Sequence, residues 1–228
     1  MTEAEWLASA MPRQLVGYIP NNATERKKRL LGCGLCRRIL HLVPDERSRR
    51  AVLVAEQFAD GAATDAELAE AEAEARTACR ESQKYVRNLD LHHYFGKGAC
   101  FWVAGKDVGN WEIPNDSNKT KPAWEDVAEL AITGGARWHT ELEAFCKLVR
   151  CIYGNPFHPV SLDPSWQTPT VLAVAQGIYA DRAFDRLPTL ADALEESGCD
   201  DPGLLNHCRT EKVHARGCWA IDLLLGMG

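Results

Sequence analysis

Residues 24–61 read TERKKRLLGCGLCRRILHLVPDERSRRAVLVAEQFADG, and the spacing of apolar residues in this stretch indicates an α-helical fold. Apolar side chains recur on one broad side of residues 24–43 while basic side chains occupy the other, as in an amphipathic helix. Pro44 ends this helix, because proline has no amide hydrogen with which to continue it. Asp45 can cap a second helix, which Gly61 stops. The stretch therefore predicts two consecutive helices.

The same helical pattern continues on both sides of this stretch. Thr2 with Glu5, and Thr64 with Glu67, have the spacing of capping boxes. We expect a short helix near the N-terminus and further helices over about residues 64–89, 124–132, 138–153, 168–183, 188–197, 204–208 and 218–225. Glycines interrupt the aromatic residues of about 91–122, where irregular or short β-like structure is expected instead. The sequence thus predicts an all-α, compact multi-helix array.

A proline-rich segment is the best candidate for a domain boundary. The run NPFHPVSLDPSWQTP contains four prolines in fifteen residues, which favours an irregular connection. We therefore expect an N-terminal helical region over residues 1–153, a connection over 154–168 and an array of short helices over 169–228. The alternative is one continuous domain.

Composition narrows the classes of protein to consider. The 228 residues include 26 Lys and Arg against 32 Asp and Glu, and 46% are hydrophobic, which is typical of a globular protein. Apolar runs fall far short of the ~20 residues that span a membrane, so no membrane association is expected. The N-terminus has acidic residues where a secretory signal has basic ones. We therefore expect a cytoplasmic protein whose nine cysteines are reduced.

Charges are distributed unevenly along the first helices. Nine Lys and Arg lie within residues 26–50, whereas seven acids and no bases lie within 51–75. If the helices form a hairpin, the two segments neutralise each other, which is the favoured interpretation. The alternative is a basic surface around Arg37 and Arg38 that binds a partner or nucleic acid. Nucleic acid is the less favoured partner, because the interleaved aromatic residues of a single-strand binder are missing.

The densest set of candidate metal ligands lies near the C-terminus. It consists of His207, Cys208, His214 and Cys218, whose thiolate and imidazole groups suit zinc. Adjacent residues such as His207 and Cys208 point about 100° apart on a helix, so both seldom reach one metal. Cys33 and Cys36 share a helical face and could contribute if the fold brings the chain ends together. The alternative, which we favour, is that these cysteines are small buried hydrophobes and that no cofactor is bound.

Catalytic residues are not predicted. Cysteine nucleophiles need a nearby histidine base, and the pairs to consider are Cys208 with His214 and Cys146 with His139. The second pair is separated by about two helical turns, too far for a direct hydrogen bond. Neither pair is accompanied by a turn that could form an oxyanion hole.

Two tryptophans are candidates for an interaction surface. Trp166 and Trp219 are large apolar side chains of the kind found at hot spots of protein interfaces. Burial in the core is the alternative for both, and we favour it.

Three runs of sequence together cover most of the chain outside about residues 91–122. They read ERKKRLLGCGLCRRILHLVPDERSRRAVLVAEQFADG, IYGNPFHPVSLDPSW and IYADRAFDRLPTLADALEESGCDDPGLLNHCRTEKVHARGCWAIDLLLG. These runs resemble a large family of uncharacterised planctomycete-type bacterial proteins that occur in many copies per genome. Relatives usually have adjacent cysteines before the Arg-Arg pair, whereas this chain has Cys33 and Cys36 separated by two residues. The resemblance implies no activity, cofactor or catalytic residue.

These observations favour a non-catalytic protein-interaction or scaffold module. One alternative is a zinc-stabilised regulatory or nucleic-acid-binding module that uses the histidines and cysteines near the C-terminus. A thiol-dependent enzyme is the other alternative. The partner and the oligomeric state do not follow from the sequence.

Overall fold

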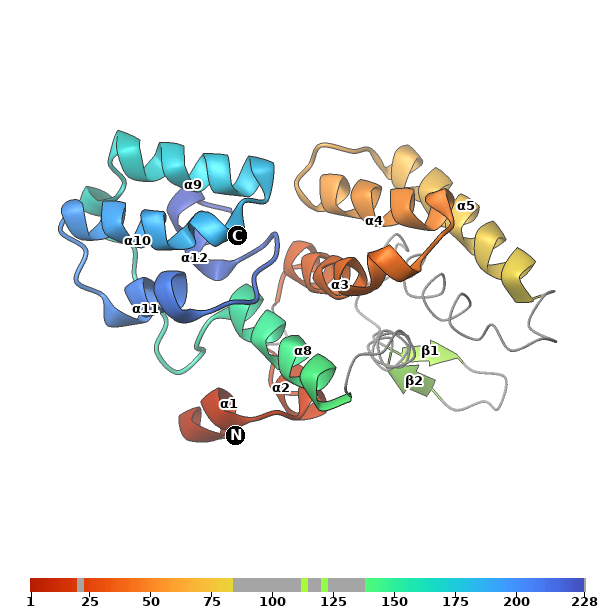
Figure 1. Cartoon of the computed structure of the whole chain (residues 1–228), viewed down its shortest axis with the longest axis horizontal. Helices are drawn as coiled ribbons and strands as arrows, with labels where there is room; N and C mark the ends of the chain where they lie inside the picture. Colours follow the sequence, from red (N-terminus) through yellow and green to blue (C-terminus); the bar gives the residue numbers. More distant parts are fainter. Residues whose placement is uncertain (20–22, 84–111, 115–119, 123–137, 228) are drawn as a thin grey trace. The chain divides into compact units, whose positions relative to one another are not determined.

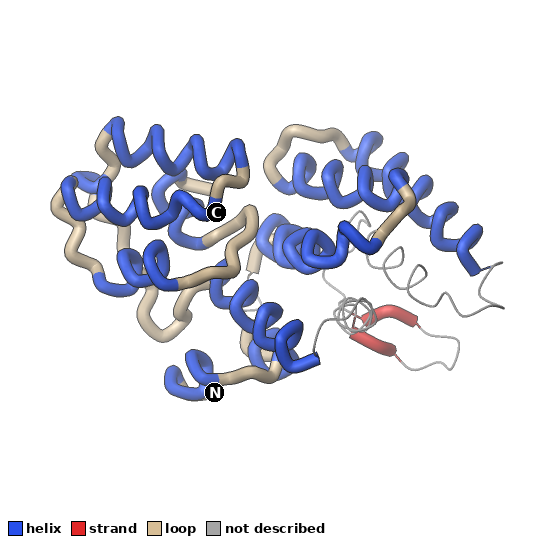
Figure 2. The backbone as a smooth tube through the Cα atoms, viewed as in Figure 1, coloured by secondary structure: helices blue, strands red, loops and turns tan. Residues whose placement is uncertain are grey.

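The computed structural model describes residues 1–19, 23–83, 112–114, 120–122 and 138–227 (Figure 1). The chain divides into two units. Unit 1 consists of Met1–Asn22 and Ala144–Gly228, and unit 2 consists of Ala23–Glu143. Helices dominate the described residues of both (Figure 2), so the predicted all-α class is confirmed. None of these described helices is both long and apolar enough to cross a membrane.

Unit 1 begins with two short helices, α1 (Glu3–Ala8) and α2 (Pro12–Val16). The predicted capping box is present at α1, where Thr2 and the Glu5 side chain each accept from the other's backbone amide. The sequence pattern does not predict α2, which is only five residues long. Unit 1 continues in the last part of α8 (Trp138–Tyr153), as predicted for this helix.

Short helices form the rest of unit 1. They are the 3-10 helix η3 (Pro164–Trp166), α9 (Pro169–Asp181), the 3-10 helix η4 (Phe184–Arg186), α10 (Leu187–Glu196), α11 (Pro202–Thr210) and α12 (Trp219–Leu225). Thr168 and Asp201 cap α9 and α11 through their side chains, and a proline occupies the first turn of each. Apolar residues of all four α-helices share one core, which includes the fully buried Ile178, Leu190, Leu204 and Ile221.

The proline-rich segment does not separate two compact units. Trp166, within this segment, belongs to the core that α9 to α12 form, and so does Cys151, which precedes it. The segment is therefore packed as part of unit 1, and the chain divides instead near residues 22 and 143. This division differs from the predicted one. The sequence shows where the prolines lie, but it does not show that Trp166 among them packs against apolar residues of later helices.

Unit 2 contains α3 (Glu25–Ile39), the 3-10 turn η1 (Leu40–Leu42), α4 (Glu46–Ala59) and α5 (Asp65–Gln83). The helices begin where predicted, since Thr24 caps α3, Asp45 caps α4, and Thr64 forms its capping box with Glu67. The first of them ends before Pro44 in the single turn of η1. Cys33, Leu31, Val52 and Ala71 are fully buried among these helices.

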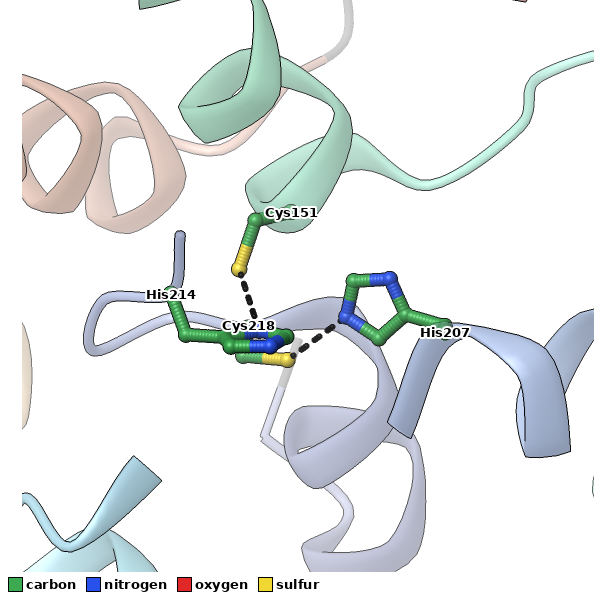
Figure 3. A group of neighbouring side chains, drawn as sticks. All are labelled: Cys151, His207, His214 and Cys218. Carbon is green, nitrogen blue, oxygen red and sulfur yellow. Dashed lines mark hydrogen bonds between the residues drawn. The ribbon is translucent and has the colours of Figure 1, made fainter. Parts of the chain in front are cut away.

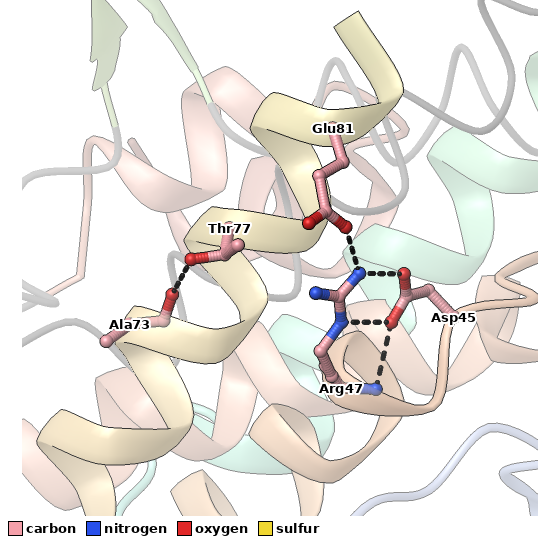
Figure 4. A network of polar contacts seen from close by, with 5 residues as sticks. All are labelled: Asp45, Arg47, Ala73, Thr77 and Glu81. Carbon is pink, nitrogen blue, oxygen red and sulfur yellow. Dashed lines mark hydrogen bonds and ion pairs between the residues drawn. The ribbon is translucent and has the colours of Figure 1, made fainter. Parts of the chain in front are cut away.

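Ion pairs engage many of the basic residues within residues 26–50. Each pair joins an arginine of α3 or α4 to an acidic residue: Arg26 to Asp60 (3.1 Å), Arg37 to Glu56 (2.6 Å), Arg38 to Glu141 (2.8 Å) and Arg50 to Glu74 (2.7 Å). Arg47 bridges two helices, because its guanidinium binds Asp45 at the start of α4 and Glu81 in α5 (Figure 4). The pairs of Arg26 with Asp60, Arg37 with Glu56 and Arg50 with Glu74 join residues 26–50 to residues 51–75, so the expected mutual neutralisation is observed in these three pairs.

The described residues also contain one short antiparallel hairpin, in which β1 (Glu112–Pro114) pairs with β2 (Thr120–Pro122). This hairpin lies within the segment expected to be irregular or β-like. The helix expected over 124–132 lies outside the described residues.

Candidate metal centre

Four potential metal ligands from distant parts of unit 1 come together. They are Cys151, His207, His214 and Cys218, and their ligand atoms all lie within 4.8 Å of one another (Figure 3). The two cysteines are fully buried, and the two histidines are partly buried. No other group of three or more such ligands was found among the described residues.

His207 reaches this group from the last turn of α11. Its Nε2 lies 3.2 Å from the Sγ of Cys218. The imidazole ring packs against the ring of Trp219, with ring centroids 5.1 Å apart, and makes an edge contact with His214 at the same separation. Because its neighbours are rings on two sides, the side chain of His207 is held facing the cluster.

An extended connection between α11 and α12 supplies the next two ligands. The guanidinium of Arg216 lies over the Tyr179 ring of α9 at 4.9 Å and so anchors the connection to the core. Gly217 adopts a positive φ of 84°, a conformation that L-residues with a side chain seldom take. The backbone amide of Cys218 then donates to the carbonyl of Ala215 at 3.1 Å. This turn places Cys218 at the N-cap position of α12.

Cys151 comes from the other side of the site, in the last turn of α8. Its Sγ lies 3.5 Å from Nδ1 of His214. The helix ends at Tyr153, and Gly154 follows it with a φ of 69°. An added Cβ at Gly154 would lie 3.2 Å from Cγ of Trp219, so the chain passes very close to α12 here.

His214 has the hydrogen bond that usually orients a metal ligand. Its Nε2 lies 3.1 Å from the carbonyl oxygen of Glu211, and a proton on Nε2 would be donated to that oxygen. The lone pair on Nδ1 then faces the cluster. Metal-bound histidines commonly donate their second ring N–H to a carbonyl in this way.

Distances within the group are close to those of a tetrahedral zinc site. Zinc bonds of about 2.3 Å to sulfur and 2.0–2.1 Å to nitrogen place tetrahedral ligand atoms roughly 3.3–3.8 Å apart. Two separations, 3.5 Å from Cys151 Sγ to His214 Nδ1 and 3.2 Å from Cys218 Sγ to His207 Nε2, are near that range. Small side-chain movements would bring the remaining separations into it.

The surroundings of Cys218 favour its thiolate. Burial by itself raises the pKa of this thiol, but the hydrogen bond from Cys151, the charge and hydrogen bond of His207 and the hydrogen bond of His214 together outweigh it. The pKa of Cys218 is consequently held well below its ordinary value. Thiolate is the form that binds metal.

Cys208 does not belong to the group, although the sequence placed it among the candidate ligands. It is buried in the apolar core of α9 to α12, next to His207 in sequence but turned away around the helix. Desolvation raises the pKa of Cys208, which keeps it a neutral thiol. The structure therefore brings together His207, His214 and Cys218 from the predicted set and replaces Cys208 with Cys151.

No pattern in the sequence marks Cys151 as a candidate metal ligand. It lies 63 residues from His214, in a helix whose pattern marks it only as an apolar position. Cys33 and Cys36 are buried in α3 of unit 2 and are not in the cluster. In the part of the chain that the structure describes, eight cysteines are present and none forms a disulfide.

The candidate interaction residues are largely engaged within the chain. Trp166 is 8% exposed and lies in the core, and Trp219 packs against the same core, Gly154 and His207. Arg37 and Arg38 each form a bidentate ion pair, with Glu56 and Glu141 respectively. All four side chains therefore make contacts within their own unit, and their part in an interaction surface stays a prediction.

Of the pairs considered for thiol catalysis, Cys208 with His214 is not assembled. Cys208 is buried in the core rather than facing His214, and Cys146 is buried in α8. The side chain of His139 is not among those that the structure describes, so the pair of Cys146 with His139 stays untested.

Comparisons with family models, curated proteins and solved structures give no match to this chain. The function must therefore be argued from the site itself.

Proposed function

We propose that this protein is a non-catalytic helical module in which unit 1 is stabilised by one structural zinc ion. The observation that carries the proposal is the convergence of Cys151, His207, His214 and Cys218 within 4.8 Å. Two thiolates and two imidazoles form a ligand set that zinc favours over magnesium or calcium, which prefer oxygen. Recognition of another protein is the class of function that we propose for such a module.

The number of ligands favours a structural role for the ion. Catalytic zinc sites usually keep one coordination position open for water or substrate. Here four protein ligands would complete a tetrahedron, and both cysteines are buried. No position would then remain for a substrate.

Metal binding would add directly to the stability of unit 1. The ligands come from α8, from α11 and from the connection that leads into α12. Such a set does not exist in the unfolded chain, so the binding free energy contributes to folding. One ion would hold the end of α8 against the C-terminal helices.

Metal analysis of the 228-residue chain tests the proposal. The chain is purified under reducing conditions without chelator or affinity nickel, and we expect about one zinc per chain. X-ray absorption at the zinc edge should then report two sulfur and two nitrogen ligands. Substoichiometric zinc after reconstitution, or a shell of oxygen ligands, would refute the proposal.

A thiol-dependent enzyme is a second candidate, because Cys218 lies 3.2 Å from His207 and has a lowered pKa. Full burial of Cys218 counts against this role, since a nucleophile must reach its substrate. Alkylation by iodoacetamide at neutral pH separates the two. A catalytic cysteine would be labelled rapidly and stoichiometrically in the native protein, whereas zinc-bound Cys218 should be protected until the metal is removed.

A further inference from the structure

The N-terminal segment, residues 1–18, docks on the stretch that carries one of the proposed metal ligands. We call residues 150–158 the platform. Both belong to unit 1. The platform contains Cys151, and the residues beside this cysteine bind the N-terminal segment directly.

Polar contacts join the segment to the platform along its length. The guanidinium of Arg150 donates to the carbonyl of Trp6 at 2.8 and 2.9 Å and to that of Ser9 at 2.5 Å. The indole of Trp6 donates to the carbonyl of Gly154 at 3.2 Å. Asn155 donates to the carboxylate of Glu3 at 2.7 Å. The segment is thus held by the side chains of Arg150 and Asn155 and by the main-chain carbonyl of Gly154, all at or just after the end of α8.

Apolar contacts accompany these hydrogen bonds. Trp6 is 1% exposed and Leu15 is fully buried, so each has been removed from water. The ring of Tyr18 stacks on Phe157 of the platform, with centroids 5.4 Å apart and planes 9° apart. Release of the segment would expose these side chains together with the surface that they cover.

Trp219 provides a second connection between the metal ligands and the platform. One side of its ring lies against His207, and an added Cβ at Gly154 would lie 3.2 Å from its Cγ. Gly154 in turn accepts the hydrogen bond from Trp6. The platform is therefore fixed from two directions, through Cys151 and through Trp219.

We infer that metal binding at Cys151, His207, His214 and Cys218 controls the docking of residues 1–18. The inference rests on the proposed function. With metal bound, Cys151 is fixed to α11 and α12, and the platform keeps the geometry that the segment recognises. Without metal, the connection through Cys151 is weakened and only the contact with Trp219 holds the end of α8, so the segment is released more readily, together with Trp6 and Leu15. The segment would then act as a metal-responsive strap.

Linkage makes this inference reciprocal. If metal strengthens docking by some factor, docking must strengthen metal binding by the same factor. Coupling between two such sites is typically on the order of tenfold. A substitution that weakens the contacts between residues 1–18 and the platform, without replacing a metal ligand, should therefore weaken zinc binding by up to the same factor.

Hydrogen exchange measured by mass spectrometry on the 228-residue chain tests the effect of metal on docking. We expect amides of residues 3–16 to exchange on the order of tenfold faster after zinc removal, and readdition of zinc to restore protection. Amides of α4 in unit 2 serve as the internal reference and should not change. If zinc binds but the exchange of residues 3–16 is the same with and without it, the inference is wrong while the proposed function stands. If no zinc binds, the proposed function itself fails.

Two variants test the effect of docking on metal binding. Asn155→Ala removes one polar contact of the dock, and Trp6→Phe removes the indole N–H while keeping an aromatic ring. Each should weaken zinc affinity in a competition titration with a chromophoric chelator, up to about tenfold. Leu53→Ala, an exposed position of α4, is the matched control and should leave affinity unchanged. Wild-type affinity in both dock variants, with faster exchange of residues 3–16, would overturn the coupling.

Discussion

Nδ1 of His214 lies 3.5 Å from Sγ of Cys151, although the two residues are 63 positions apart in the chain. This contact closes the candidate metal centre, because it joins the ligands of the C-terminal segment to the end of α8. His207, His214 and Cys218 alone would provide three ligands within twelve residues. The fourth depends on tertiary packing.

The identity of the fourth ligand leads to the first prediction. Cys151→Ala should abolish stoichiometric zinc binding, because it leaves three ligands and a gap in the tetrahedron. Cys208→Ala is the matched control, since Cys208 is an equally buried cysteine next to His207 that is not in the cluster. It should retain one zinc per chain while losing some core packing. Metal content of the two purified variants checks this, and loss of zinc in Cys208→Ala alone would support the ligand set expected from sequence.

Three of the four candidate ligands can be predicted from the sequence, for a clear physical reason. His207, His214 and Cys218 are close in the chain, so short-range spacing could identify them. Geometry of a helix also indicated that His207 and Cys208 do not both face one metal, and the structure shows which of them is turned to the core. Cys151 was not predictable, because its approach depends on how α8 packs against helices that follow much later.

Removal of the metal gives the second prediction. A ligand that binds only the folded state at a thousandfold excess over its Kd stabilises that state by about 4 kcal/mol. Addition of a strong chelator should therefore lower the melting temperature of unit 1 on the order of 15 °C. Calorimetry with and without chelator measures the shift. Cys151→Ala should melt low from the outset and should not respond to chelator, whereas an equal response in that variant would mean that the metal binds elsewhere.

Helix boundaries are easier to predict from the sequence than the division of the chain into two units. Thr24, Asp45, Thr168 and Asp201 cap helices in the structure, because a cap depends on only three or four neighbouring residues. The proline-rich segment was expected to be a boundary, yet Trp166 within it is buried in the core of unit 1. Prolines specify local backbone shape, while unit boundaries depend on contacts that span the chain.

The third prediction concerns a buried ion pair in unit 2. Glu56 has a side chain only 2% exposed, and Arg37 binds both of its oxygens at 2.6 Å. Arg37→Met removes this partner from a desolvated carboxylate and should cost about 3 kcal/mol in the free energy of unfolding. Adding Glu56→Gln removes the charge as well and should recover part of the loss. Urea denaturation of the single and double variants measures both values.

Zinc content should be the same in these two variants, because the ion pair lies in unit 2. A loss of less than about 0.5 kcal/mol in Arg37→Met would show that the pair behaves like an exposed one. That outcome would contradict the burial on which this prediction depends.

The last prediction separates backbone strain from a steric contact beside the metal centre. Gly154 and Gly226 have nearly the same positive φ, 69° and 67°, so alanine at either position is strained by a similar amount, about 1 kcal/mol. Only at Gly154 does the added Cβ meet another residue, 3.2 Å from Cγ of Trp219, whereas nothing lies within 4 Å at Gly226. Gly154→Ala should therefore cost an additional 1–3 kcal/mol, roughly as for overpacking. Because Trp219 packs against His207, Gly154→Ala should also weaken zinc binding, while Gly226→Ala should not. Equal stability and equal zinc affinity in the two variants would show that Trp219 moves aside without disturbing His207.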